Sequence, residues 1–283
     1  MTSNFGEDYY MHGGCGGPYT QYREFFHGIA ERIVADFAPT SVLDAGCAFG
    51  YLVEALRELG VEAYGIDIST YAINQVSEDV RPYCKVASLL EDLPDDMPHH
   101  YDLVTNIEVL EHLHEKESLS ALAKLCTLTE RIVFSSTPDD ITEPTHYNVR
   151  LSEYWCLNFA EHGFRHALDY QADYISPQAM LFHKEDMSPV SLVEDYERHI
   201  RLAKQKQKAL RVDIDELSNT YAKEQEAYSQ CLTRVSELEG SIAGLKAEAR
   251  DLRLSHSYRV GHAVLTPLRA LSNLGSAFVP RKG

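Results

Sequence analysis

The stretch SVLDAGCAFG, residues 41–50, constrains the fold of this chain more than any other. Its first half favours a strand that closes at Asp44, and Gly46 and Gly50 bracket a tight loop. Residues 51–59, YLVEALREL, then repeat apolar side chains at helical spacing. A strand, a glycine turn and a helix predict the first unit of an open α/β sheet, which binds ligands beside the carboxyl ends of its strands.

A second strand is expected over Val61–Ile68, and it ends in another acid, Asp67. Asp67 lies 23 residues after Asp44. An acid at this place in such a sheet suits the two hydroxyls of a bound ribose. Glycine loops of this kind also serve dinucleotides, so the pattern alone leaves the nucleotide open.

The run DAGCAFG and the later Asp67 resemble the motifs of the class I S-adenosylmethionine (SAM)-dependent methyltransferases, with Ala48 in place of the middle glycine. The resemblance covers about Tyr19 to Glu185. It implies a Rossmann-like, seven-stranded α/β sheet with helices on both faces, and SAM as the cofactor. The usual aspartate after the third strand is missing, and Ser88 and Leu89 stand there. The residues implied to surround the cofactor are Asp44, Gly46, Cys47, Gly50, Asp67, Ile68, Ser88, Leu89 and Asn106.

The rest of the first two-thirds is expected to complete this domain. Residues 1–19 are rich in glycine and aromatics, and they predict an ordered loop or lid rather than a helix. The expected domains are a lid and helix over 1–40, a SAM-binding domain over 41–186, a helical coiled coil over 187–254 and a basic tail over 255–283. Further elements are expected at Tyr22–Phe37 (helix), Cys84–Ala87, Tyr101–Ile107 and 132–135 (strands), Ser152–Gly163 (helix), and Phe164–Tyr170 with Ala179–Lys184 (an antiparallel pair).

The stretch EVLEHL after the fourth strand holds the second informative pattern. Glu108, Glu111 and His112 share one face if a helix begins there. His146 follows the fifth strand, and loops after neighbouring parallel strands meet at one edge of a sheet. Two carboxylates and two imidazoles are therefore expected to meet, which is the composition of a divalent-metal site.

The spacing E-x-x-E-H with a later His resembles one methyltransferase branch, which includes the small-RNA 2′-O-methyltransferases and the UbiG-type ubiquinone-pathway O-methyltransferases. The resemblance implies a divalent ion, Mg²⁺ first, that grips two adjacent oxygens of a vicinal diol or catechol. The imidazoles would also accept Mn²⁺, Fe²⁺ or Zn²⁺. Such a cation lowers the pKa of the hydroxyl, and His146 or His112 takes the proton. Two alternatives stay open: a metal-free site with one histidine as the base, or structural roles for all four residues.

Composition limits which class of acceptor the protein can bind and in which cellular compartment it can be expected. Residues 1–200 hold 12 Lys and Arg against 34 Asp and Glu, within a net charge of −17, and this acidity disfavours a nucleic-acid acceptor. The scattered cysteines form no CxxC pair, which indicates free thiols in a cytoplasmic protein. No signal peptide and no run of ~20 apolar residues is visible.

Aromatic and polar residues alternate over His146–Phe164 and suit a sugar face, although Trp155 fits the apolar face of a helix better. The resulting hypothesis is a metal-assisted SAM-dependent O-methyltransferase that acts on a hydroxyl of a sugar or glycan in polysaccharide biosynthesis. The alternatives are a small-molecule N- or O-methyltransferase and a non-catalytic scaffold. The intact Asp44 and Asp67 pair speaks against the scaffold.

The C-terminal third has a different pattern. Apolar residues from Ile214 to Leu252 recur in steps of three and four, with Glu224 as an acid within this heptad seam. The seam predicts a long helix in a homo-oligomeric coiled coil of unspecified strand number; a solvated single helix is the alternative. The tail, Ser255–Gly283, is apolar and basic, and loosely resembles tails of bacterial surface-polysaccharide enzymes. It suits the inner face of an anionic cytoplasmic membrane or a protein partner.

Overall fold

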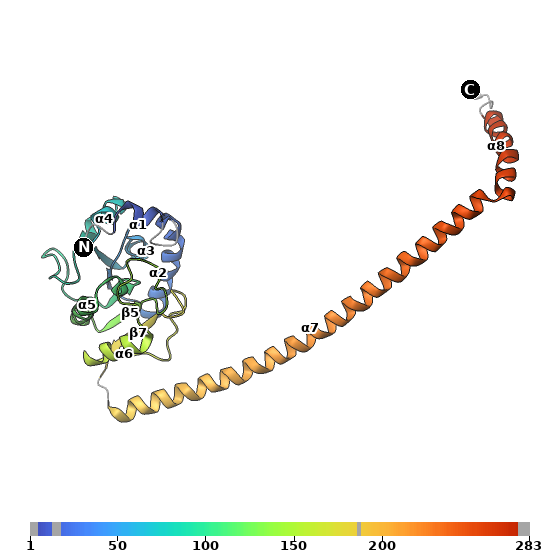
Figure 1. Cartoon of the computed structure of the whole chain (residues 1–283). Coiled ribbons are helices and arrows are strands. Elements are labelled where there is room, and N and C mark those ends of the chain that lie inside the picture. Colours follow the sequence, from blue (N-terminus) through green and yellow to red (C-terminus); the bar gives the residue numbers. More distant parts are fainter. Residues whose placement is uncertain (1–4, 13–17, 186–187, 277–283) are drawn as a thin grey trace, which may run out of the picture. The chain divides into compact units, whose positions relative to one another are not determined.

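The computed structural model describes residues 5–12, 18–185 and 188–276. Contacts divide the chain into two compact units, residues 1–202 and residues 203–283, and each is described here by itself. The first unit holds the sheet and the second is helical (Figure 1).

The first unit contains the expected seven-stranded sheet, in the order β3-β2-β1-β4-β5-β7-β6. Strands β1 to β5 run parallel, and β7 runs antiparallel to both β5 and β6. The strand order reverses between β1 and β4, which is where open α/β sheets bind their ligands. The strands are β1 (Ser41–Ala45), β2 (Glu62–Asp67), β3 (Cys84–Val86), β4 (Leu103–Ile107), β5 (Arg131–Ser135), β6 (Phe164–His166) and β7 (Met180–Lys184).

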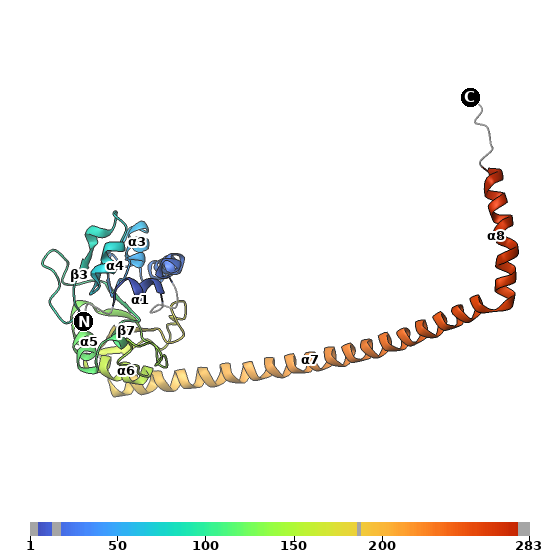
Figure 2. The same ribbon diagram turned by 45° about the horizontal axis from the view of Figure 1, so that its top comes forward.

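Helices cover both faces of this sheet, as expected (Figure 2). Neighbouring residues of one strand point to opposite faces, so Val42 and Leu43 enter two different cores. One core is covered by α2 (Arg23–Phe37), α3 (Tyr51–Glu58) and α4 (Thr70–Gln75). The other is covered by α5 (Glu115–Leu128) and α6 (Ser152–Glu161). The described residues of this unit also form the 3₁₀ turns η1 (Tyr19–Tyr22), η2 (Arg81–Tyr83) and η3 (Leu110–His112).

Trp155 belongs to the second core. Its side chain is 1% exposed, and its ring lies 5.2 Å from that of Phe134. It packs under α6 as the apolar face of that helix and presents no surface to a sugar.

The expectation of a loop over residues 1–19 was wrong where the structure describes this segment. A short helix, α1 (Glu7–His12), forms there, with the acids Glu7 and Asp8 in its first turn, where the helix dipole favours them. Tyr10 of this helix is buried against Phe49. The segment is also tied to α4, because the Ser69 hydroxyl donates a hydrogen bond of 2.5 Å to the carbonyl oxygen of Phe5.

The helix expected over EVLEHL was also wrong. Glu108 has a left-handed backbone with a φ of 52°, residues Leu110–His112 form η3, and α5 begins only at Glu115. Beside this turn, Val109 packs directly onto Gly46 of the loop after β1. Because the chain turns here, Glu108 does not share a helical face with Glu111 and His112.

The C-terminal segment forms α7 (Pro189–Leu254) and α8 (His256–Ser276). The long helix expected from the heptads is confirmed, and its pairing stays a prediction. Every residue from 203 to 254 is exposed. Among the described helices, none combines the length and the apolar character that a membrane span requires.

Candidate active site

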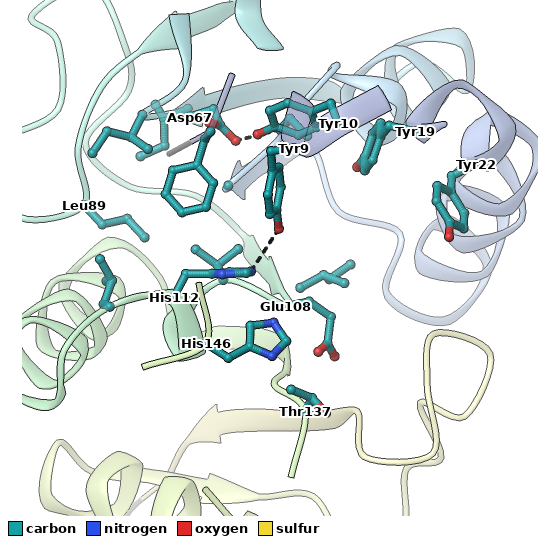
Figure 3. Close-up of a pocket in the computed structure, with 18 of the residues that line it drawn as sticks. Tyr9, Tyr10, Tyr19, Tyr22, Asp67, Leu89, Glu108, His112, Thr137 and His146 are labelled. Atoms are coloured by element: carbon teal, nitrogen blue, oxygen red, sulfur yellow. Dashed lines mark hydrogen bonds between the residues drawn. The ribbon is translucent and has the colours of Figure 1, made fainter. Parts of the chain in front are cut away.

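A cavity of about 480 Å³ lies at the carboxyl ends of the parallel strands (Figure 3). Residues from the loops after β1 to β5 line it, and aromatic side chains from the segment before α2 and from the first turn of α2 cover it. Asp67 lies at one end and the two histidines lie at the other, with Tyr9 between them. The covering side chains are Phe5, Tyr9, Tyr10, Tyr19, Tyr22, Phe25 and Phe26.

Gly46 shapes the first end of the cavity. Its φ is 98°, and a Cβ built on it would lie 2.3 Å from the Val109 side chain. Only glycine fits such a backbone and such a close approach. The turn that it allows directs the backbone N–H of Ala48 at Asp67 Oδ2, over 2.9 Å.

Asp67 is held by two backbone hydrogen bonds, since the N–H of Ser69 also donates to its Oδ1 over 2.8 Å. Its side chain is buried and lines the cavity. Burial raises its pKa, and the two N–H donors oppose that rise. The carboxylate keeps further lone pairs that two ribose hydroxyls can use.

The structure brings Gly46, Asp67, Ile68, Ser88 and Leu89 to the cavity, as the resemblance implied. The other four implied cofactor residues, Asp44, Cys47, Gly50 and Asn106, are not among its lining residues. These four residues instead pack behind the Gly46 loop and hold it in place.

Each of these four supporting residues has a contact that explains its place. Thr105 donates a hydrogen bond of 2.7 Å to Asp44, and burial raises the Asp44 pKa to about 7. Asn106 donates to the Ala45 carbonyl oxygen over 2.8 Å. Cys47 packs onto Gly65, and a Cβ built on Gly50 would meet the side chains of Val76 and Cys84.

A cluster of possible metal ligands lies at the second end. Glu111, His112 and His146 each offer a ligand atom within 4.8 Å of the others. Glu111 is 0% exposed, and neither oxygen of its carboxylate makes a hydrogen bond of normal geometry to the described residues, although the side chains of Glu108 and Ser136 lie close enough to affect its pKa. Burial, and next the neighbouring carboxylate of Glu108, raise the Glu111 pKa well above its ordinary value.

Backbone hydrogen bonds assemble this cluster from two loops. The N–H groups of Tyr147 and Asn148 donate to the carbonyl oxygen of Glu111 over 2.8 and 2.9 Å. These two bonds hold the loop after β5 against the η3 turn. His146 is thereby placed with its ring 4.7 Å from that of His112.

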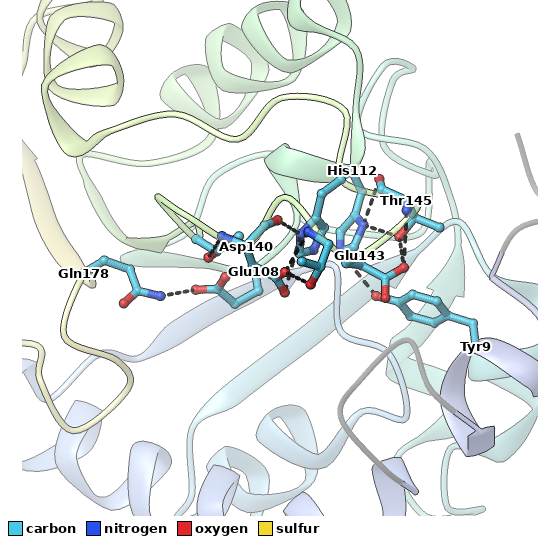
Figure 4. Close-up of polar contacts among 10 residues, drawn as sticks. Tyr9, Glu108, His112, Asp140, Glu143, Thr145 and Gln178 are labelled. Atoms are coloured by element: carbon cyan, nitrogen blue, oxygen red, sulfur yellow. Dashed lines mark hydrogen bonds and ion pairs between the residues drawn. The ribbon is translucent and has the colours of Figure 1, made fainter.

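The protonation of His112 follows from its neighbours (Figure 4). Thr145 has one hydroxyl proton, which it donates to the Glu143 carboxylate over 2.9 Å. The contact of 2.9 Å between His112 Nδ1 and Thr145 Oγ1 therefore needs the proton on the histidine. Burial, and then the nearby His146, lower the His112 pKa to about 4, so the ring is neutral and its Nε2 carries a lone pair.

His146 is arranged in the same way. Its Nδ1 lies 2.7 Å from the carbonyl oxygen of Asp140, which can only accept, so Nδ1 carries the proton. The Nε2 lone pair is left for another partner. Imidazoles that bind metals are held in this manner, with the second nitrogen donating to a carbonyl or a similar acceptor.

Glu108 lines the same cavity but does not belong to the cluster of three. Gln178 donates a hydrogen bond of 3.3 Å to its Oε1. Of the four predicted ligands, the structure thus places three together and one beside them.

Tyr9, Thr145, Glu143, Asp140 and Gln178 were missed as site residues by sequence reasoning. The Tyr9 hydroxyl donates a hydrogen bond of 3.2 Å to His112 Nε2, and this bond links the segment before α2 to the η3 turn. The glycine- and tyrosine-rich segment signalled a lid, but no spacing in the sequence links it to His112. A sequence signal existed for the loop before His146, because Asp140, Glu143 and Thr145 precede it by six, three and one positions, and Glu143 could be noted as near the site without a role.

Comparison with known proteins gives the family. Residues 19–175, more than half of the chain, match the model of a methyltransferase domain. Ubiquinone biosynthesis O-methyltransferase of Nitrosospira multiformis is 35% identical over 107 residues, which are 36% of this chain and 45% of that protein. The enzyme of the same name from Methylococcus capsulatus is 33% identical over 106 residues, 35% of this chain and 44% of that one. The chain thus spans about half the length of the curated relatives it matches.

Some solved structures also resemble part of this chain. The magnesium protoporphyrin IX methyltransferase of Synechocystis PCC 6803 with bound SAH has a TM-score of 0.47 and 17% identity, covering 59% of this chain and 84% of that one. A SAM-dependent methyltransferase from Archaeoglobus fulgidus has a TM-score of 0.42 and 25% identity, covering 50% and 69%. The family match, the sheet order and the glycine loop agree: the chain belongs to the methyltransferase family, as a class I SAM-dependent methyltransferase.

Proposed function

We propose that this protein is a SAM-dependent O-methyltransferase, assisted by a divalent metal ion, that methylates one of two adjacent hydroxyls. One observation carries the metal half of this proposal: the fully buried carboxylate of Glu111 makes no hydrogen bond of normal geometry and no ion pair with the described residues, and the side chains that lie near enough to affect its pKa are those of Glu108 and Ser136. Leaving such an acid without a partner is costly, and a cation removes that cost.

The donor set fits a divalent ion. It consists of one carboxylate oxygen and the Nε2 atoms of two imidazoles whose Nδ1 protons are engaged elsewhere. This set suits Mn²⁺, Fe²⁺ or Zn²⁺, and an added oxygen from Glu108 would bring it closer to the preference of Mg²⁺. A divalent ion held there supplies Lewis acidity, which favours loss of a proton from an acceptor hydroxyl.

The two ends of the cavity have different roles in the proposed reaction: one end binds the methyl donor and the other binds the acceptor. Asp67 and the Gly46 loop would hold the donor, and the aromatic side chains that cover part of the cavity would limit the access of water. Methyl transfer forms an oxygen–carbon bond as the sulfur–carbon bond of SAM breaks, and it leaves S-adenosylhomocysteine, a methyl ether and a proton. His146 Nε2, or His112 Nε2 once Tyr9 has moved away, can take up that proton.

The acceptor that we propose is a vicinal diol of a sugar or glycan. Polar side chains at the second end suit its hydroxyls, whereas the buried Trp155 offers it no stacking surface. A catechol is the second candidate, because it offers the same two oxygens on a flat ring that aromatic side chains can cover. The relatives favour this candidate, since they are named for O-methylation in ubiquinone biosynthesis.

A methyl-transfer assay on both acceptor classes, with and without EDTA, tests the proposal. We expect activity on acceptors with adjacent hydroxyls, its loss on chelation and its return with Mg²⁺ or Mn²⁺. Acceptors with a single isolated hydroxyl are the matched control and should be poor. Activity that survives exhaustive chelation would contradict the metal-assisted mechanism, and full activity on the isolated hydroxyl would contradict the diol.

His146→Ala separates the ion from the cofactor. We expect this variant to bind SAM as the wild-type protein does, because His146 and Asp67 lie at opposite ends of the cavity. Its activity should fall by about 100-fold or more. Loss of SAM binding in this variant would mean that the residue acts on the fold rather than on the acceptor.

The tail is proposed to bring the enzyme to an anionic membrane surface. In α8, exposed Val260, Val264 and Leu265 accompany Arg259, a pairing of apolar and basic residues that suits such a surface. A chain that ends at Leu254 should lose binding to anionic liposomes. Equal binding by the shortened and full chains would contradict this role, and a protein partner would then be the better explanation.

A further inference from the structure

The second unit leaves an apolar seam on α7 uncovered. From residue 203 to Leu254 every residue is exposed, and the large apolar seam residues from Ile214 to Leu252 range from 46% exposed at Val235 to 71% at Leu217. A helix that presents such a stripe to water gains stability by covering it. We propose that a second copy of this chain covers it, in a parallel, in-register, two-stranded coiled coil over residues 214–252.

The residues at the two seam positions favour two parallel strands. β-branched side chains recur at the first position of the heptad and leucine recurs at the fourth. In parallel coiled coils this arrangement selects a dimer over a trimer or tetramer. Three of the six first-position residues are β-branched, Ile214, Val235 and Ile242, while the other three are Tyr221, Tyr228 and Ala249. Four of the six fourth-position residues are leucines, Leu217, Leu238, Leu245 and Leu252, while the other two are Glu224 and Cys231.

The charges that flank the seam agree with a parallel register. In such a pair, Arg234 of one copy faces Glu239 of the other, and Glu248 faces Arg253. Both pairs join opposite charges, and the two-fold symmetry makes each of them twice. The heptad before the seam would instead place Lys206 opposite Arg211, and this repulsion favours a paired region that begins after it.

Two unusual seam residues specify the register. Glu224 and Cys231 both stand at the fourth position, so each meets its own copy when the chains are in register. Two facing glutamates weaken the pair, as polar seam residues generally do, in exchange for a defined partner and register. This inference concerns the second unit alone and stands whether or not the first unit transfers methyl groups.

The mass of the full-length protein in solution is the first test. Light scattering should give twice the 32.0 kDa of the chain over the micromolar range. A monomer would overturn the proposal, and so would a trimer or tetramer.

Cross-linking between single cysteines tests the orientation. In a Cys231→Ser background, Leu245→Cys places a thiol on the seam and the matched Ala247→Cys places one on the outer face of the same turn. Mild oxidation should cross-link most of the Leu245→Cys protein and little of the Ala247→Cys protein. A full-overlap antiparallel pair would keep the two copies of residue 245 far apart, so a dimer without this cross-link would overturn the parallel assignment.

Glu224→Leu tests the register. Replacing the two facing carboxylates with leucine should raise the melting temperature of the dimer, followed by helical circular dichroism, by several degrees. The matched change Glu226→Leu, on the outer face, should leave it nearly unchanged. An unchanged or lower melting temperature in Glu224→Leu would overturn the in-register pairing.

Discussion

A buried acid stands at each end of the cavity, and the two acids differ in their hydrogen bonding. Asp67 lines the first end, whereas Glu111 lies beside His112 and His146 of the second end and is not itself a lining residue. Asp67 accepts two backbone hydrogen bonds, from Ala48 and Ser69. Glu111 is more deeply buried and accepts no hydrogen bond of normal geometry from the described residues, with the Ser136 hydroxyl as its nearby donor. At the first end the Asp67 carboxylate is already held by hydrogen bonds and can bind a neutral ligand such as a ribose. At the second end the described residues place no positive charge beside the Glu111 carboxylate.

Gly46→Ala should have the largest effect and should act at the first end. A methyl group would lie 2.3 Å from Val109, on a backbone with a φ of 98°. We expect SAM affinity, measured by calorimetry, to fall by at least about 100-fold, since strain and overpacking together cost several kcal/mol. Gly28→Ala in α2 is the control, because a Cβ there meets nothing within 4 Å. Unchanged SAM binding in Gly46→Ala would show that this loop does not hold the donor.

A pair of variants should separate the two ends. Ligand at about 100 times its Kd stabilises a protein by about 2.7 kcal/mol, which raises Tm by roughly 5–10 °C at this size. Asp67→Asn should lose the rise with SAM but keep the rise with Mn²⁺. Glu111→Gln, which keeps the shape of the protonated acid, should show the reverse. Loss of both responses in either variant would mean that the ends are not independent.

The pH dependence of the unfolding free energy tests the protonation of a third buried acid, Asp44, which lies behind the Gly46 loop. Burial raises the pKa of Asp44 to about 7, from an ordinary value of 3.8. Between these two pH values the folded protein holds a proton on Asp44 that the unfolded chain has released. The unfolding free energy should therefore fall as the pH rises from about 4 to about 7, by up to about 4 kcal/mol from this group. Denaturant titrations should show a weaker fall in Asp44→Asn.

Asp102→Asn is the control of opposite sign. The hydroxyl and the backbone N–H of Thr40 lower the pKa of Asp102, so its contribution is present above about 4 and is lost as the pH falls further. An Asp44→Asn variant with the same slope as the wild-type protein would contradict the assignment of a protonated Asp44.

Tyr9→Phe should have the smallest effect and should act at the second end. The Tyr9 hydroxyl donates to the Nε2 lone pair of His112 that an ion would use. Removing one such bond should strengthen Mn²⁺ binding by about 2–10-fold, the usual net value of a hydrogen bond. Tyr22→Phe, which alters the lid elsewhere, is the control. Weaker Mn²⁺ binding in Tyr9→Phe would show that the hydroxyl supports the ion site rather than competing with the ion.

The first end could be predicted from the sequence because its signal is local. The Gly46 loop and Asp67 follow two adjacent strands, and short-range patterns report both. The seven strands were predicted for the same reason, since strand-forming runs alternate with helical ones. Asp44 and Asn106 were assigned to the cofactor because spacing alone does not tell a side chain in a cavity from one that supports it.

For the second end, the sequence predicted the three residues that meet but not the backbone structure that brings them together. Glu111, His112 and His146 do meet, but through a 3₁₀ turn and backbone bonds to the Glu111 carbonyl, not through a helical face. The left-handed backbone at Glu108 adjoins the packing of Val109 on Gly46, and no local pattern in the sequence encodes either of them. Tyr9 could not be predicted as the partner of His112, because 103 residues separate them.

Binding of Mn²⁺ to the purified protein, followed by electron paramagnetic resonance at neutral pH, tests the central claim most directly. The account predicts that one ion per chain is bound by the wild-type protein after removal of any resident metal, and that Glu111→Gln leaves the ion free. If the wild-type protein and Glu111→Gln leave the same amount of Mn²⁺ in solution, the buried carboxylate does not hold a cation and the account is contradicted.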